Sequence, residues 1–347
     1  MEKELMAKLA LDHILGGAAN QEDATIFATS ITEAKRLYKQ HMIRPDGAQY
    51  RRELIDYICT PSNNVLGDAD EYHNLLMDIF RIGDYFSGMK LCQYALTFYP
   101  HNCDLLGDGI KAAADGGDFE LAESLFGIAD SIEKSRWNFR LFLYSVDYYK
   151  TKYKADPTQQ AVIDKAKSLA DEYVKYFPYD EHGYNQQAEL LLLENKRDEA
   201  IDLLHHYIFD PLDSKNASTS LITAQCCTTL LQILDDSNNY NLIIKTARRG
   251  IRNSKTVQLS ASVGYFAYRW ALALDAMCAD EDYEKESRIE EALRKYQAAY
   301  NIANDSDFSS VIEQNYSFLR SFVLGKERDP GPLVKYRLYI DKTNDAD

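Results

Sequence analysis

The chain has 347 residues, of which 46% are apolar, and its 54 acidic and 39 basic side chains give a formal net charge of −15. This apolar fraction excludes a wholly disordered chain, and the excess of acid disfavours a broad nucleic-acid binder, which needs a dense basic surface. The N-terminal apolar stretch is interrupted by Lys8, Asp12 and His13, and the longest uncharged run is too polar for hydrocarbon. We therefore expect a cytoplasmic protein that binds neither nucleic acid nor membrane.

Apolar residues recur at spacings of three and four along almost the whole chain, which predicts α-helices joined by short turns. Two helices are expected before residue 60, and a series of helix pairs follows up to about residue 303. Outside the regular repeats, the expected helices cover residues 22–41, 47–59, 221–234, 240–250, 257–278, 288–303 and 307–324.

The turns between the helices share one register. Gly83-Asp84 and Gly117-Asp118 are 34 residues apart. The same offset joins three further pairs of positions: Gly88 with Ala122, Cys92 with Phe126, and Ala95 with Ala129. A common period over so many positions predicts a repeated helix pair.

A third copy of the pattern begins at Tyr184 and ends at Pro211. Ala188 takes the small position of its first helix and Ala200 that of its second, where two antiparallel helices come close together. These copies resemble the tetratricopeptide repeat, a helix pair with a period of 34 residues. The resemblance implies an all-α, right-handed superhelical array of antiparallel helix pairs, an α-solenoid, with a short non-helical C-terminal tail.

A weaker copy lies between the second and third copies. Trp137, Leu141 and Tyr144 suit a first helix, and Ala166 and Tyr173 suit its partner. The loop around Ala155-Asp156-Pro157 is expected to make this copy about ten residues too long. The predicted organisation is N-terminal capping helices at 1–69, repeats with a closing helix at 70–324, and an extended tail at 325–347.

In the tetratricopeptide family, first helices line a groove that holds a peptide or a partner domain. The resemblance therefore implies groove positions on the exposed sides of the first helices. This set lacks the Lys/Arg cluster that would hold a partner's terminal carboxylate. The candidates are His73, Met77, Phe80, Arg81, Asp104, Lys111, Phe139, Asn185, Glu189, Leu192, Thr228 and Gln232.

The C-terminal tail departs from the helical pattern. Asp329-Pro330-Gly331-Pro332 stops any helix, and apolar and polar residues then alternate as in a β-strand. This segment packs against the last repeat, lies in the protein's own groove, or adds a strand to a partner's sheet. The side chains expected to make such contacts are Val334, Tyr336, Leu338 and Ile340.

Catalytic and metal-binding motifs are absent from the sequence, so we expect no enzyme, no cofactor and no metal site. Asp68, Asp70, Glu71 and His73 cluster at a helix start, where acidic residues usually cap the helix. The six cysteines form no CxxC pair and are interpreted as small buried hydrophobes.

The predicted function is a non-catalytic adaptor that binds another protein or a peptide. The charge of −15 suggests a basic partner, because it would steer one towards the protein. The alternative is a regulatory subunit that controls an associated enzyme or toxin, or senses a peptide. An enzyme with an unrecognised site is the third hypothesis.

Overall fold

The computed structural model describes residues 28–42, 44, 47–210, 223–256 and 260–279, with single positions between 291 and 299. The chain divides into two compact units, unit 1 up to Tyr176 and unit 2 from Phe177. The predicted closing helix and the tail lie outside the described residues. The domain boundaries at 69 and 324 stay predictions.

The described residues form thirteen α-helices, labelled α2 to α14, two 3-10 helices and no β-strand. Unit 1 contains α2 (Ile31–Met42), α3 (Gly47–Ile58), η1 (Pro61–Asn63), α4 (Ala69–Phe80), α5 (Tyr85–Leu96), α6 (Cys103–Asp115), α7 (Phe119–Asp130), η2 (Lys134–Arg136), α8 (Phe139–Ala155) and α9 (Gln160–Tyr176). Unit 2 contains α10 (Glu181–Leu193), α11 (Arg197–Phe209), α12 (Ala224–Ile233), α13 (Tyr240–Thr256) and α14 (Ser260–Ala279).

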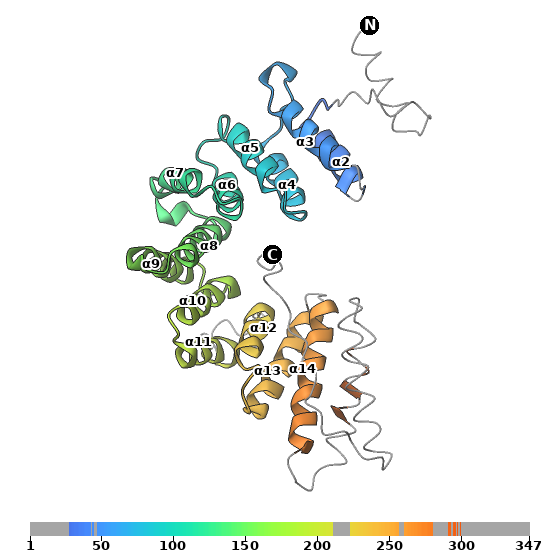
Figure 1. Ribbon diagram of the computed structural model, residues 1–347, viewed down its shortest axis with the longest axis vertical. Helices are drawn as coiled ribbons and strands as arrows, with labels where there is room; N and C mark the ends of the chain where they lie inside the picture. The colour runs from blue at the N-terminus through green and yellow to red at the C-terminus, as the bar shows by residue number, and fades with distance from the viewer. Residues whose placement is uncertain are drawn as a thin grey trace. The chain divides into compact units, whose positions relative to one another are not determined.

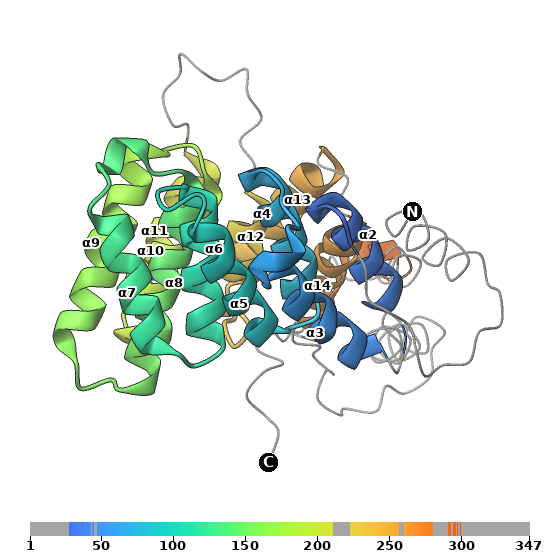
Figure 2. The ribbon, with the colours of Figure 1, turned by 90° about the horizontal axis from the view of Figure 1, so that it is seen from above.

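The helices pack in series, as the repeat pattern predicts. Each helix pair packs together, and each first helix also contacts the first helix of the next pair: α2 with α4, α4 with α6, and α6 with α8. In unit 1 the first helices form one layer and the second helices α5, α7 and α9 form another (Figures 1 and 2). Unit 2 repeats this pattern, with α10 against α12 and α12 against α14. The fold is therefore all-α and tetratricopeptide-like.

Three turns confirm the predicted register. Gly83, Gly117 and Asn195 each link a first helix to its second helix with a positive φ of 70°, 79° and 60°. In each turn the next residue's backbone N–H donates to a carbonyl five positions back; the pairs are Asp84 to Ile79, Asp118 to Ala113, and Lys196 to Leu191. Glycine and asparagine are the residues that accept this left-handed backbone most readily.

Small residues allow the close approach of α10 and α11. Ala188 and Ala200 are fully buried, as the sequence predicts. The rings of Tyr184 and Tyr207 stack beside them, with centroids 4.0 Å apart. Tyr207 is buried and Tyr184 half-buried, and the stacking of their rings adds apolar contact between the two helices.

The weak copy is longer than the others for a different reason from the predicted loop. Both α8 and α9 have 17 residues, whereas α4, α5 and α7 have 12 each. The link between α8 and α9 covers only residues 156–159. The prediction of a long loop is wrong because each of the two helices is five residues longer than α4: α8 continues to Ala155, and α9 begins at Gln160.

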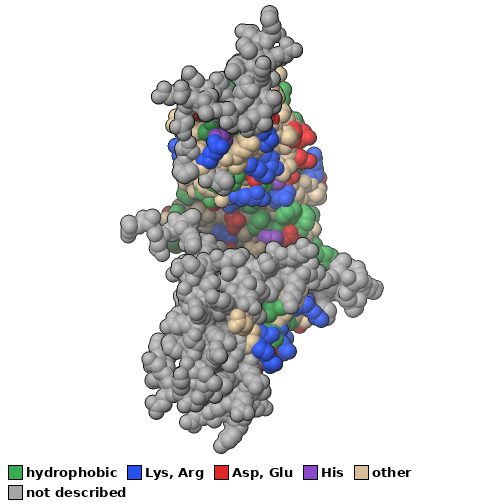
Figure 3. All heavy atoms as spheres, turned by 90° about the vertical axis from the view of Figure 1, so that its right-hand side faces the viewer, with side chains coloured by type: hydrophobic (Ala, Val, Ile, Leu, Met, Phe, Trp, Pro, Cys, Tyr) green, Lys and Arg blue, Asp and Glu red, His purple; other side chains and the backbone are tan. Residues whose placement is uncertain are grey.

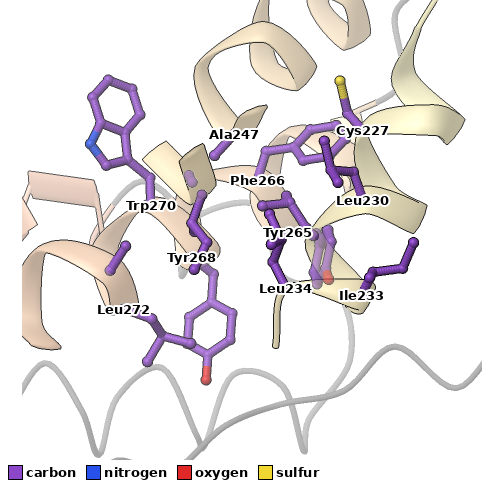
Figure 4. Close-up of a cluster of buried hydrophobic side chains, with 14 of the residues drawn as sticks. Cys227, Leu230, Ile233, Leu234, Ala247, Tyr265, Phe266, Tyr268, Trp270 and Leu272 are labelled. Carbon is purple, nitrogen blue, oxygen red and sulfur yellow. The ribbon is translucent and has the colours of Figure 1, made fainter. Parts of the chain in front are cut away.

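The described helices of unit 2, α10 to α14, all contribute to one hydrophobic core. Figure 4 shows Phe266 near Cys227 and Leu230, in the buried cluster that also includes Ala247. Gly250 of α13 lies directly against the Phe266 ring, where an added Cβ would be only 2.7 Å from ring atoms. Such close contact leaves no room for a side chain at this position.

Candidate interaction face

Side chains from α2, α4, α6 and α8 meet between neighbouring first helices of unit 1. We call this set the inner face. Two members lie on α2, and the others lie on α4, α6 or α8, except Arg81, which directly follows α4. The members are Lys35, Lys39, His73, Asp78, Arg81, Asp104, Asp108, Lys111, Arg140 and Tyr144.

Side-chain caps fix where these helices begin. Asp68, Asn102 and Asn138 each accept a hydrogen bond from the backbone N–H three residues later, at the start of α4, α6 and α8. At α4, Glu71 also bonds back to the Asp68 backbone N–H, which completes a capping box and confirms that both residues cap the helix. Equivalent caps set the three helices in the same phase, so positions counted from the cap lie side by side.

The centre of the inner face is a pair between α4 and α6. His73 Nδ1 lies 2.7 Å from Asp108 Oδ2, and Asp108 is completely buried. Burial raises the pKa of Asp108 to about 6, against the opposing effect of the hydrogen bond and charge of His73. The hydrogen bond to Asp108 raises the pKa of His73. The pair therefore holds a proton more tightly than the isolated side chains would.

A second pair joins α6 to α8. Arg140 donates from Nη1 to Asp104 Oδ1 at 3.0 Å, and its guanidinium lies 4.8 Å from the centre of the Phe139 ring. On the same two helices, Lys111 lies 5.5 Å from the centre of the Tyr144 ring and bonds Asp115 at 2.7 Å. The inner face thus combines ion pairs with cations held over aromatic rings.

A group of cations surrounds one buried carboxylate between α2 and α4. Arg81 bonds Asp78 at 2.8 Å, and the amines of Lys39 and Lys35 lie 3.4 Å and 4.0 Å from Asp78 Oδ2. Figure 3, a view onto this side of the molecule, shows Lys and Arg side chains gathered at the level of α2 and α4. Three cations around one carboxylate leave local positive charge.

The predicted candidates in unit 1 have different surroundings. His73, Arg81 and Lys111 take part in the pairs described above, and Met77 is half-buried on the same helix side as His73 and Arg81. Phe139 lies under the Arg140 guanidinium. Phe80 packs within its own helix pair, 6.5 Å from the Tyr85 ring centre, so it contributes to the core more than to the inner face.

The candidates in unit 2 are mainly structural. Asn185 is buried: its amide donates to Glu189 at 2.7 Å, and its oxygen accepts from the Thr229 hydroxyl of α12. The Thr228 hydroxyl donates to a carbonyl of its own helix, and Gln232 is half-buried. Asn185 therefore joins α10 to α12 and is not available to a ligand.

Six members of the inner face were not among the candidates from sequence: Lys35, Lys39, Asp78, Asp108, Arg140 and Tyr144. Asp108, Arg140 and Tyr144 occupy helix positions in the same phase as the named candidates, and counting from the caps would have found them. Lys35 and Lys39 were missed because α2 was assigned to a capping segment outside the array.

Clustered metal-ligating side chains and membrane-spanning helices are both absent among the described residues. Among those residues, no three His, Cys, Asp or Glu side chains lie close enough to hold a metal ion. No described helix is both long and apolar enough to cross a bilayer. The tail candidates Val334, Tyr336, Leu338 and Ile340 lie outside the described residues.

Comparison with known proteins adds little beyond the fold. No family model matches the chain, and no curated protein matches it. A tetratricopeptide repeat protein of Thermus thermophilus, known from its crystal structure, is similar over 71% of this chain and 97% of its own, with 14% identity and a TM-score of 0.38. From its own helix pairing and its three matching turns, the chain has a tetratricopeptide-like α-solenoid fold.

Proposed function

We propose that the chain is a non-catalytic adaptor that binds a peptide or a partner domain through the first helices of its repeats. A cytoplasmic location belongs to the same proposal and rests on the sequence alone. The ligand would lie across α2, α4, α6 and α8.

The observation that carries this proposal is the meeting of side chains from successive repeats. His73 contacts Asp108 across α4 and α6, and Asp104 contacts Arg140 across α6 and α8. A ligand on this face would therefore meet polar groups from several repeats at once. Such contacts add along the ligand, which is how a repeat array builds affinity from weak single contacts.

Site-specific photo-crosslinking tests the proposal. A photo-reactive amino acid replaces Met77 on α4 or, as the matched control, Phe86, which is 70% exposed on the second helix α5. The proteins are irradiated in native cells, and crosslinked species are identified by mass spectrometry. We expect a discrete protein adduct at position 77 and none at 86.

Adducts only at position 86, or equal adducts at both positions, would contradict a first-helix binding face. If the crosslinked partner is an enzyme whose activity changes when it binds this chain, the result would favour the regulatory alternative, in which the same face carries a switch. Both variants must unfold at the temperature of the unmodified chain, so that a crosslinking difference reports the face and not the fold.

A further inference from the structure

We propose that the inner face recognises an acidic stretch of its partner, an extended segment with several Asp or Glu side chains. This inference rests on the proposed function and specifies its ligand. It differs from the expectation of a basic partner, which came from the charge of the whole chain.

The first argument is the burial of the charges. Asp78 and Asp108 are 2% and 0% exposed, whereas the side chains of Lys39, Arg81 and Arg140 are 48%, 68% and 36% exposed. Asp78 thus lies beneath the cations that surround it, and Asp104, the partner of Arg140, is 26% exposed and so less exposed than the guanidinium. A ligand meets the ammonium and guanidinium groups first, and a carboxylate is their natural partner.

The second argument is the contrast with the rest of the chain. The first helix of the inner face, α2, contains three Lys or Arg and one Glu, although the chain as a whole has a net charge of −15. An acidic ligand is repelled by most of this surface and attracted where cations are exposed. Repulsion of the ligand by the acidic surface elsewhere makes binding at other sites less favourable.

The third argument is the span of the cations. Lys39 and Arg140 lie on α2 and α8, and Arg81 directly follows α4. Packed helices are about 8–10 Å apart, so the row from α2 to α8 extends over about 25–30 Å. An extended peptide covers that distance with about eight or nine residues. Charges spread this widely suit an internal acidic stretch better than a single terminal carboxylate.

His73 gives the face a proton-linked contact. Its Nδ1 bonds Asp108, and among the described residues its second ring nitrogen has no hydrogen-bond partner. Asp104 of α6 and Arg140 of α8 are the other charged groups near the ring. When protonated, His73 offers an N–H to a ligand carboxylate, so binding weakens as the pH rises through the pKa of His73.

Selection from a random library of nine-residue peptides tests the proposal on the full chain. Wild type is compared with the triple variant Lys39→Gln, Arg81→Gln, Arg140→Gln. The matched control is Lys90→Gln, Lys165→Gln, Lys175→Gln, which removes the same charge from the second helices α5 and α9. We expect Asp and Glu to be enriched by wild type and by the control, and not by the triple variant.

Fluorescence anisotropy with a selected peptide then gives the size of the effect. Loss of three partly exposed charge contacts should weaken binding about tenfold, and the control should bind like wild type. Binding by wild type should weaken between pH 6 and pH 8, and His73→Gln should flatten that dependence. A blocked peptide C-terminus should change nothing, because the ligand is an internal stretch.

Enrichment of Lys and Arg in the selected peptides, or no enrichment at all, would overturn the acidic-ligand inference. An adduct at position 77 would still support the binding face in that case. The acidic-ligand inference would also be overturned if selected peptides bound the triple variant as tightly as wild type. If, in addition, no adduct formed at position 77, the proposed function would be overturned as well. Displacement of the peptide by a short thymidine oligonucleotide at lower concentration would point to nucleic acid. If the pH dependence of peptide binding were the same in His73→Gln as in wild type, His73 would not make the proposed proton-linked contact.

Discussion

The first helices of unit 1 and unit 2 pack in the same way and use different chemistry. In unit 1 the polar side-chain contacts between α4, α6 and α8 include the His73–Asp108 and Asp104–Arg140 pairs, and the Arg140 side chain is 36% exposed. In unit 2 the polar contacts between α10 and α12 are a buried hydrogen bond, in which the Thr229 hydroxyl donates to the Asn185 amide oxygen, and backbone bonds to the Glu181 carboxylate.

The Glu181 carboxylate caps a helix in the next repeat. Its Oε2 accepts hydrogen bonds from the backbone N–H groups of Gln225 and Cys226, at 2.8 Å and 3.3 Å, in the first turn of α12. Thr223, the N-cap residue of α12, makes no such bond with its own side chain. The polar groups of unit 2 are buried and join its helices, whereas unit 1 places paired cations at its surface, where we propose that the ligand binds.

Glu181→Ala should give the largest loss of stability. Two helix N-terminal N–H groups would lose a buried acceptor, at a cost of about 3 kcal/mol. Chemical denaturation measures the effect, with Asp202→Ala, an exposed carboxylate of α11, as the control. A loss below about 1 kcal/mol would mean that water replaces the carboxylate and that α12 needs no cap from α10.

Asp108→Asn should change the pH dependence of unfolding. Because the folded state raises the pKa of Asp108 to about 6, wild type loses stability as the pH rises from 4 to 6. The expected loss over that range is about 2 kcal/mol, and the amide, which does not titrate, should remove it. Asp104→Asn, at a half-buried site, is the control; an equal slope in wild type and Asp108→Asn would contradict the buried pair.

Asn185→Ala should cost about 1–2 kcal/mol, because the buried Thr229 hydroxyl loses its acceptor. A double-mutant cycle with Thr229→Val isolates the bond between α10 and α12. Coupling near zero would show that the two side chains act independently, and the proposed structural role of Asn185 would fail.

Arg81→Gln should have the smallest effect on stability. Its side chain is 68% exposed, and the Lys39 amine stays 3.4 Å from the buried Asp78, so the free energy of unfolding should change by less than about 0.5 kcal/mol. Thermal denaturation checks this. A larger loss would mean that Arg81 is needed to hold the buried Asp78 and is not free to contact a ligand.

Much of the fold could be predicted from local pattern. The spacing of apolar residues, the small residues Ala188 and Ala200, and the turns at Gly83 and Gly117 all report contacts within one or two helices. The extra length of α8 and α9 could not be predicted, because Ala155-Asp156-Pro157 indicates a break between the helices but not how far each helix extends towards it.

The candidate site was harder to predict, because its contacts join residues far apart in sequence. Glu181 caps a helix more than forty residues away, and Asp108 meets His73 only when two repeats stack. Lys39 belongs to a helix whose repeat pattern is weak. The role of the tail at 334–340 stays a prediction.

Hydrogen–deuterium exchange of the full chain with a selected peptide tests the inner face most directly. Binding slows exchange where the ligand stabilises the helices beneath it. We expect slower exchange in α4 and α6, with no change in α5 and α7 or in unit 2. Protection confined to the second helices, or to unit 2, would contradict a binding face made by the first helices of unit 1.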